Sequence, residues 1–203
     1  VRALVGPGDN AIVICPTYSI FKSAITMSGG ETRQVPLVRD GERFCLDLDR
    51  VRGAVDSRTR MLIVNSPSNP TGWVISREEQ EALCLLATEH DIMILSDEVY
   101  DRLVFDGPVA PSFARVATER DHLIVVNGFS KAYNMTGWRL GYGLAGERLI
   151  SLMTKAAEFM TSSPPAMVQQ AGITALRDGE AYVEQIRDLY SHRRNFVMEQ
   201  LGR

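Results

Sequence analysis

Polar side chains that could do chemistry follow three separate apolar runs of the sequence. The first run leads into SPSNPTG, which contains Asn69; the second leads into DEVYD, which contains Asp97 and Tyr100; the third leads into GFSK, which ends at Lys131. A lysine amine can act as a nucleophile and proton carrier, and carboxylate, phenol and amide groups can hold and orient a bound ligand. The first question is whether these four side chains meet in one site.

Taken one at a time, each segment has a simpler explanation. SPSNPTG has the composition of a turn, and Asp97 could cap a helix with Tyr100 packed behind it. A lone lysine such as Lys131 is usually a solvated charge. Their joint occurrence after successive apolar runs is harder to explain in this way. The carboxyl ends of parallel strands meet at one edge of a sheet, where ligands bind.

The apolar runs are typical of strands that are covered on both faces. Four of them are unbroken and rich in Ile and Val, and a fifth is less regular. We predict strands at 11–15, 61–65, 92–96, 123–127 and 140–144.

Helical patterns lie between and after these runs. Ser76 and Glu79 have the spacing of a capping box, and the turns that follow carry residues spaced as on one helix face, namely Leu83, Leu86, Ala87 and His90. Further helices are predicted at 18–27, 48–55, 147–155, 166–176 and from 181 onward. Strand–helix alternation predicts an α/β fold, a mainly parallel sheet with helices on both faces in three α/β/α layers. The helical tail is either an outer layer of this domain or the start of a second one.

Composition narrows the class of protein. The chain has 203 residues, a length typical of one large domain, and 22 basic against 25 acidic residues give a net charge of −3. This balance leaves no excess of basic residues for binding nucleic acid or an anionic membrane, so we expect neither as a partner. No apolar run approaches the ~20 residues of a membrane span. Three widely separated cysteines suit reduced thiols and a cytoplasmic location.

Three segments together closely resemble the large domain of the class I/II aminotransferases, which are fold-type-I enzymes that use pyridoxal phosphate. They are NSPSNPTG (65–72), SDEVYDRLVF (96–105) and NGFSKAYNMTGWRLGYG (127–143). The resemblance covers almost the whole chain in the expected order and spacing, and the third segment is the most specific. It implies that residues 1–203 form the pyridoxal-phosphate-binding large domain, with an N-terminal arm and a C-terminal small domain outside this sequence.

The resemblance assigns roles to the four side chains after the apolar runs. Lys131 matches the lysine that forms the Schiff base with the cofactor and later carries the substrate's α-proton. Asp97 matches the carboxylate beside the pyridine nitrogen. Asn69 and Tyr100 match the pair that hydrogen-bonds the phenolic oxygen of the ring.

Further positions follow from the same resemblance. Arg139 matches the arginine that binds the phosphate, for which a planar guanidinium is suited, and Tyr18 matches the aromatic residue that stacks on the ring. Many relatives have a serine three residues before the lysine as a phosphate ligand, but here that residue is Gly128, and Ser130 is the candidate substitute. The family also predicts a cis peptide bond before Pro70.

The function implied is an aminotransferase that moves an amino group between an amino acid and a 2-oxo acid by a ping-pong mechanism. The resemblance further implies a homodimer, in which 161–165 is a candidate contribution to the neighbouring subunit's site. Two alternatives remain, a lyase or synthase on the same fold and the effector-sensing domain of an aminotransferase-like transcription regulator. The three histidines lie on different elements and lack ligand spacing, so no metal site is expected.

Overall fold

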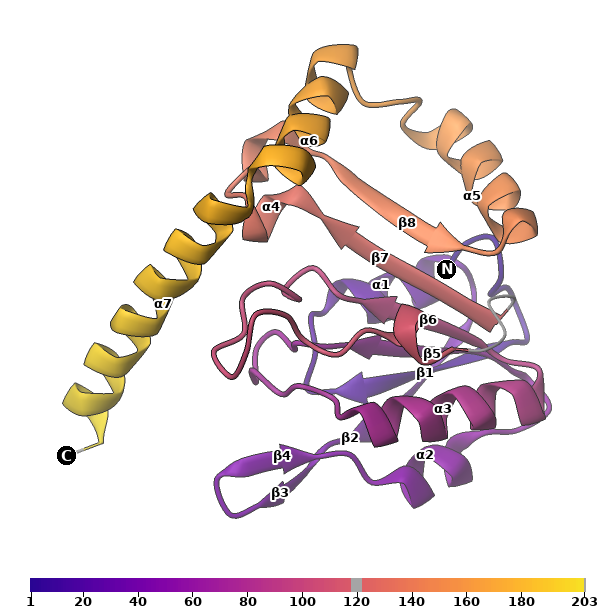
Figure 1. Cartoon of the computed structure of the whole chain (residues 1–203). Helices are drawn as coiled ribbons and strands as arrows, with labels where there is room; N and C mark the ends of the chain where they lie inside the picture. Colours follow the sequence, from indigo (N-terminus) through magenta and orange to yellow (C-terminus); the bar gives the residue numbers. More distant parts are fainter. Residues whose placement is uncertain (118–121, 203) are drawn as a thin grey trace.

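The computed structural model describes residues 1–117 and 122–202. Its strands are β1 (Asn10–Cys15), β2 (Glu31–Pro36), β3 (Val38–Asp40), β4 (Arg43–Cys45), β5 (Thr59–Asn65), β6 (Met93–Asp97), β7 (Leu123–Gly128) and β8 (Gly141–Ala145). Six of them form the central sheet in the order β2-β1-β5-β6-β7-β8, and β3 pairs with β4 in a separate hairpin (Figure 1). Neighbours in the central sheet are parallel except β7 and β8, which are antiparallel. The predicted mainly parallel sheet is confirmed.

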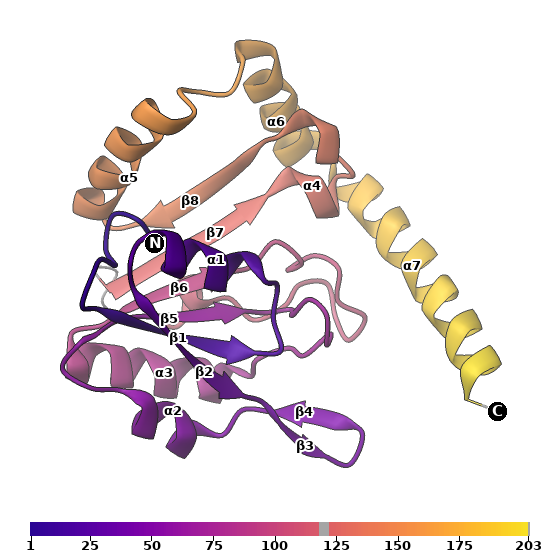
Figure 2. The same ribbon diagram turned by 180° about the vertical axis from the view of Figure 1, so that it is seen from behind.

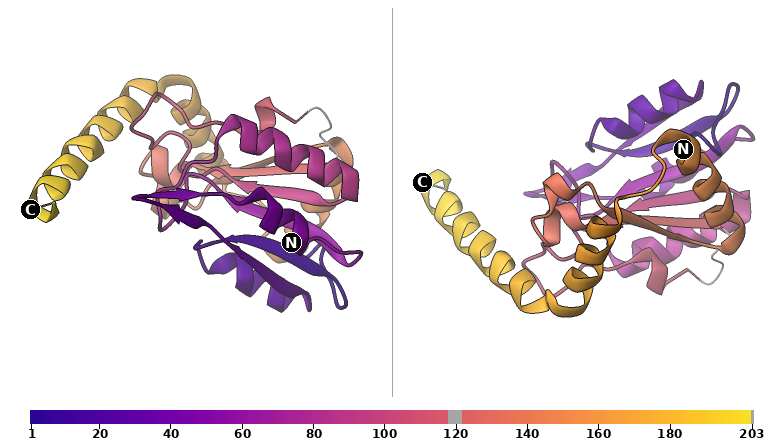
Figure 3. Two further views of the ribbon diagram at one scale, coloured as in Figure 1. Left: turned by 90° about the horizontal axis from the view of Figure 1, so that it is seen from below. Right: turned by 90° about the horizontal axis from the view of Figure 1, so that it is seen from above.

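Helices cover both faces of this sheet (Figures 1 and 2). The helices are α1 (Ile20–Met27), α2 (Leu48–Ala54), α3 (Arg77–His90), α4 (Phe129–Ala132), α5 (Glu147–Met160), α6 (Ala166–Asp178) and α7 (Glu180–Leu201), with short 3-10 turns η1 (Phe113–Arg115) and η3 (Thr136–Trp138). α1 and α5 pack on one face, and α2, α3 and η1 on the other. α7 runs away from the body (Figure 3). The three-layer α/β/α architecture is therefore confirmed.

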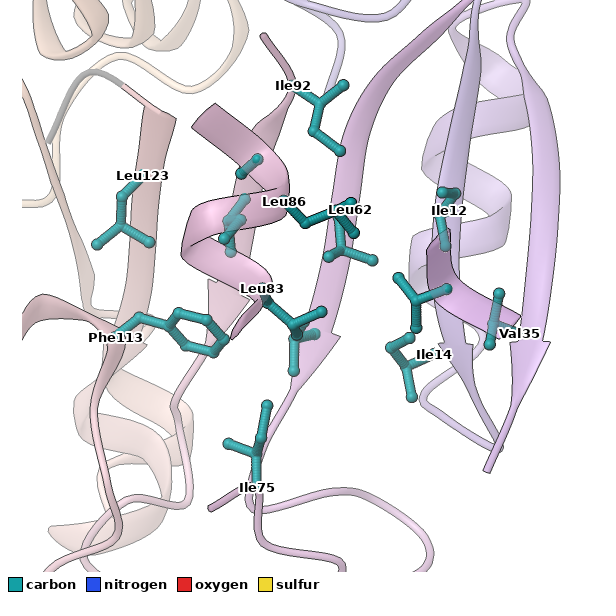
Figure 4. Packing of buried hydrophobic residues seen from close by; sticks show 14 of the residues in the cluster. Ile12, Ile14, Val35, Leu62, Ile75, Leu83, Leu86, Ile92, Phe113 and Leu123 are labelled. Carbon is teal, nitrogen blue, oxygen red and sulfur yellow. The ribbon is translucent and has the colours of Figure 1, made fainter. Parts of the chain in front are cut away.

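Strand β5 shows why the predicted strands are unbroken apolar runs. Met61 and Ile63 belong to the core beneath α1, whereas Leu62 and Val64 belong to the core beneath α3. Figure 4 shows the α3 side, where Leu62 packs near Leu83. Because alternate side chains point to opposite faces and both faces are covered, every position of the central stretch 61–64 must be apolar.

The elements that sequence patterns missed are those that cover little core. β2 lies at the sheet edge, and only Val35 among its residues is buried, so its sequence ETRQVP lacks an apolar run. The four-residue α4 is too short to show helical periodicity. The predicted strands and longer helices are all present, with ends displaced by a few residues. On the predicted face of α3, Leu83, Leu86 and Ala87 are buried, and His90, the last residue of the helix, is exposed.

The capping box at the start of α3 is also confirmed. The Glu79 N–H donates to the Ser76 hydroxyl at 3.1 Å, and the Ser76 N–H donates to the Glu79 carboxylate at 2.7 Å.

Within the two described ranges, no helix combines the length and apolar character needed to cross a membrane.

Replacing Ser76 by alanine removes one half of this capping box. We expect the free energy of unfolding to fall by about 1 kcal/mol, because one helix N–H loses its acceptor. Urea denaturation of the full-length protein measures the loss. Ser23→Ala is the control, since Ser23 is an exposed serine within α1 that caps no helix. Equal losses in the two variants would contradict a role for the capping box.

Candidate active site

The sheet topology brings the predicted side chains to one edge. β5, β6 and β7 are parallel, so the segments that follow them, with Asn69, Tyr100 and Lys131, leave the sheet on the same side. β8 is antiparallel to β7, and its first residue pairs with the last residue of β7. Arg139, two residues before β8, therefore lies at this edge as well.

Lys131 lies on α4, directly after β7. The Phe129 N–H at the start of α4 donates to the Leu140 carbonyl at 3.2 Å, which holds the short helix against the segment before β8. The Lys131 Nζ lies 5.4 Å from the centroid of the Tyr100 ring. Within the described residues Lys131 forms no ion pair. Its ammonium is thus placed against an aromatic ring without a carboxylate to neutralise it.

Asp97 is the last residue of β6. Its carboxylate accepts a hydrogen bond from the Val99 N–H at 3.2 Å. Burial raises the pKa of the Asp97 carboxyl, and this backbone hydrogen bond offsets the rise only in part. No cationic side chain in the described part of the chain pairs with it. A half-buried carboxylate of this kind is stabilised by a cationic group beside it.

Asn69 is positioned by a residue that sequence reasoning missed. The Asn65 side-chain oxygen accepts the Asn69 N–H at 2.9 Å, and the Asn65 side-chain amide donates to the Asp97 carbonyl at 3.3 Å. Asn65 thus connects the turn after β5 to the end of β6. The Asn69–Pro70 bond is cis, as predicted. Asn69 and Tyr100 line one cavity of about 530 Å³.

A second cavity, of about 420 Å³, has Lys131 and Arg139 in its wall together with Tyr18 and Val99. The Arg139 guanidinium donates to the Thr136 carbonyl at 2.9 Å and has no carboxylate partner among the described residues. Tyr18 is 51% exposed. This cavity therefore combines two cationic groups with an aromatic and an aliphatic side chain, as suits a flat anionic ligand.

Ser130 lines the same cavity as Arg139. Its carbonyl accepts a hydrogen bond from the Thr136 hydroxyl at 3.0 Å, and Thr136 is a further lining residue. At Gly128 a β-carbon would lie 3.2 Å from the Leu140 carbonyl oxygen, so a serine there would require a small shift of its neighbours. Val99 and Thr136 had no distinguishing signal in the sequence.

The structure thus brings the seven predicted residues to one edge without placing them all in one cavity. Lys131, Arg139, Tyr18 and Ser130 share the second cavity, and Asn69 lines the first. Tyr100 joins the two groups, since it lines the first cavity and lies beside Lys131. No cluster of His, Cys, Asp or Glu suited to a metal ion occurs in residues 1–117 and 122–202.

Comparison with known proteins gives one family. The model of "Aminotransferase class I and II" matches residues 1–203. The chain is 40% identical over 203 residues to an aspartate/prephenate aminotransferase of Thermus thermophilus, covering 98% of this chain and 52% of that protein. It is 37% identical over 196 residues to an aromatic-amino-acid aminotransferase of Thermococcus litoralis, covering 96% and 50%.

The fold agrees with a solved structure from the same family. The N-succinyldiaminopimelate aminotransferase of Mycobacterium tuberculosis superposes with a TM-score of 0.95 at 35% identity, covering 100% of this chain and 53% of that one. The chain spans about half the length of the curated relatives it matches. Pyridoxal phosphate is the cofactor known for this family. With the whole chain matched by one family model, this protein belongs to the class I and II aminotransferases.

Proposed function

We propose that residues 1–203 form the cofactor-binding large domain of a pyridoxal-phosphate-dependent aminotransferase. The enzyme moves an amino group between an amino acid and a 2-oxo acid. The observation that carries this proposal is the position of the Lys131 amine, 5.4 Å from the centroid of the Tyr100 ring and in the wall of the cavity lined by Arg139. Nucleophile, hydrogen-bond donor and anion-binding group are then neighbours.

The chemistry of the side chains fits pyridoxal phosphate. A lysine amine suits its aldehyde, an arginine without a carboxylate partner suits its phosphate, and a half-buried carboxylate suits its protonated ring nitrogen. When bound, the cofactor supplies an electron sink for bond cleavage at the α-carbon of an amino acid. Lys131, Arg139 and Asp97 are the residues proposed for these three contacts.

Asp97 would hold the proton on the ring nitrogen. Because burial raises the pKa of this carboxyl, a cationic partner stabilises its ionised form more than it would stabilise an exposed carboxylate. Asn69 and Tyr100 would donate hydrogen bonds to the phenolic oxygen, which requires the turn that Asn65 holds against β6.

Arg139 would bind the phosphate with two parallel N–H groups, assisted by the Ser130 hydroxyl. The Thr136 carbonyl accepts a hydrogen bond from one guanidinium N–H group, which leaves the other N–H groups for a ligand. Tyr18 and Val99, both in the wall of the same cavity, would contact the ring. Lys131 would bind the aldehyde carbon and, once displaced by substrate, carry a proton on its Nζ.

The proposed assembly is a homodimer. Thr161 to Pro165 connect α5 and α6 and are exposed, and large apolar side chains flank them, with Phe159 91% and Met167 75% exposed. Exposed apolar side chains gathered in this way are typical of an interface.

Sedimentation of the full-length protein should give twice the mass of one chain, and Phe159→Asp should shift it toward the monomer. A wild-type monomer would contradict the proposal.

Borohydride reduction in the presence of pyridoxal phosphate should attach a phosphopyridoxyl group to Lys131. The other lysines of this sequence are Lys22 and Lys155, both exposed, so peptide mapping separates the three sites. Lys131→Ala should abolish labelling within residues 1–203, and Lys155→Ala should leave it unchanged. Labelling at Lys22 or Lys155 with none at Lys131 would overturn the assignment.

Asp97→Asn should lower kcat of the full-length enzyme by about 100-fold or more, because an amide cannot stabilise the protonated ring nitrogen. Borohydride labelling of Lys131 should persist in this variant, which separates lost chemistry from lost binding. Asp40→Asn is the control, since Asp40 is an exposed carboxylate at the end of β3 that lines neither cavity. Similar kcat values for wild type and Asp97→Asn would contradict the proposed role.

A further inference from the structure

The junction between α6 and α7 contacts the turn that follows Lys131. The Asn134 side-chain amide donates to the Tyr182 hydroxyl at 3.0 Å. The Asn134 N–H donates to the Lys131 carbonyl at 3.3 Å, and its φ of 52° is a left-handed conformation that asparagine tolerates. Tyr182 is therefore hydrogen-bonded to Asn134, whose own N–H closes the turn that begins at Lys131.

Tyr133, the residue before Asn134, packs on the same junction. A β-carbon at Gly179 would lie 3.0 Å from the Tyr133 ring and would overlap the Ala175 carbonyl oxygen. Only a residue without a side chain lets the Tyr133 ring lie this close to the backbone. Tyr133 in turn packs its ring 5.6 Å from that of Phe129, which is buried at the start of α4. The junction thus reaches α4 by packing as well as by hydrogen bonding.

The same junction also contacts the turn that carries Tyr100. Arg102, two residues after Tyr100, donates to the carboxylate of Glu180, the first residue of α7. The Arg102 side chain is 22% exposed and that of Glu180 is 61% exposed. Solvent weakens such a pair, and it weakens the Asn134–Tyr182 hydrogen bond in the same way, because both of its partners are exposed. The packing of the half-buried Tyr133 ring on Gly179 is less open to solvent.

α7 itself is supported mainly near this junction. Its buried residues are Val183 and Ile186, and beyond them the helix leaves the body (Figures 1 and 3). Farther along, Arg187 donates to the Pro108 carbonyl at 3.2 Å, and the Arg194 guanidinium lies 4.3 Å from the centroid of the Phe105 ring. Both contacts are with the loop that follows Tyr100. A rotation of α7 would therefore move this loop as well as the turn that follows Lys131.

We propose that residues 179–182 position Lys131 relative to Tyr100, and that Asn134 and Tyr182 are positioning residues of the active site. The orientation of α7 then sets the separation of the Lys131 amine and the Tyr100 ring. The catalytic meaning of this positioning rests on the proposed function, whereas the contacts themselves can be tested without cofactor.

Tyr182→Phe removes one hydroxyl and leaves the ring in place. In the cofactor-free full-length protein, amide hydrogen exchange of residues 129–136 should become about fivefold faster, as expected for the loss of one hydrogen bond. Tyr190→Phe is a matched control, because Tyr190 lies two turns farther along α7 and lines a cavity with Lys131, but its hydroxyl is bonded to none of residues 129–136. The two tyrosines are 42% and 38% exposed, and the Tyr190 hydroxyl makes no hydrogen bond within the described residues. Exchange of 129–136 should be unchanged in the control.

Asn134→Gly keeps the left-handed turn available and removes the other partner. If the two side chains act through their mutual hydrogen bond, the double variant should exchange no faster than either single variant.

In the cofactor-loaded enzyme, Tyr182→Phe should lower kcat about fivefold with KM unchanged, since a positioning effect acts on chemistry rather than on substrate binding.

Two outcomes would overturn the inference while leaving the proposed function intact. One is equal exchange of 129–136 in wild type and Tyr182→Phe, with Lys131 labelled normally by borohydride. The other is faster exchange throughout the domain, which indicates general destabilisation. Conversely, absence of labelling at Lys131 in wild type would contradict the proposed function, and the exchange experiment would still decide whether the junction holds the turn.

Discussion

The parallel pairing of β5, β6 and β7 is the constraint on which the rest of the site depends. Parallel strands are connected by crossovers, so each strand ends on the same side of the sheet and delivers its following turn there. The reversal of β8 adds Arg139 to that side, because an antiparallel strand begins where its neighbour ends. Asn69 and Arg139, which are 70 positions apart in the sequence, thereby reach the same edge of the sheet.

This constraint also explains what the sequence could reveal. Strands covered on both faces carry an unbroken apolar stretch, so β5 to β7 and the turns after them could be predicted without knowledge of side-chain directions. β2 could not, because its Arg33 forms a 2.6 Å ion pair with Asp56, and no local pattern shows a partner 23 residues away. The resemblance supplied roles for Lys131 and Asp97, but the contacts of Asn65 depend on geometry alone.

The charges at the carboxyl edge are arranged differently from those elsewhere in the domain. Near the opposite ends of the strands, Arg33 and Arg60 pair with Asp56 and Asp9. At the carboxyl edge, Lys131 and Arg139 have no acidic partner within the described residues, and burial raises the pKa of Asp97. Burial disfavours the ionised form of Asp97, and a ligand with a protonated ring nitrogen would offset that cost, whereas the exposed guanidinium of Arg139 is open to a phosphate.

Lys131 lies between a strand inside the sheet and a turn held by side-chain contacts. On its N-terminal side is β7, which is hydrogen-bonded to neighbours on both edges and whose opening requires that the sheet be disrupted. On its C-terminal side, the turn at Asn134 depends on side-chain contacts with the α6–α7 junction. The proposed junction would therefore act on the Lys131 amine from the Asn134 side. In the proposed role of Lys131, which is to bind a cofactor and carry a proton, β7 would keep the residue at the edge of the sheet while α7 would set where its amine lies.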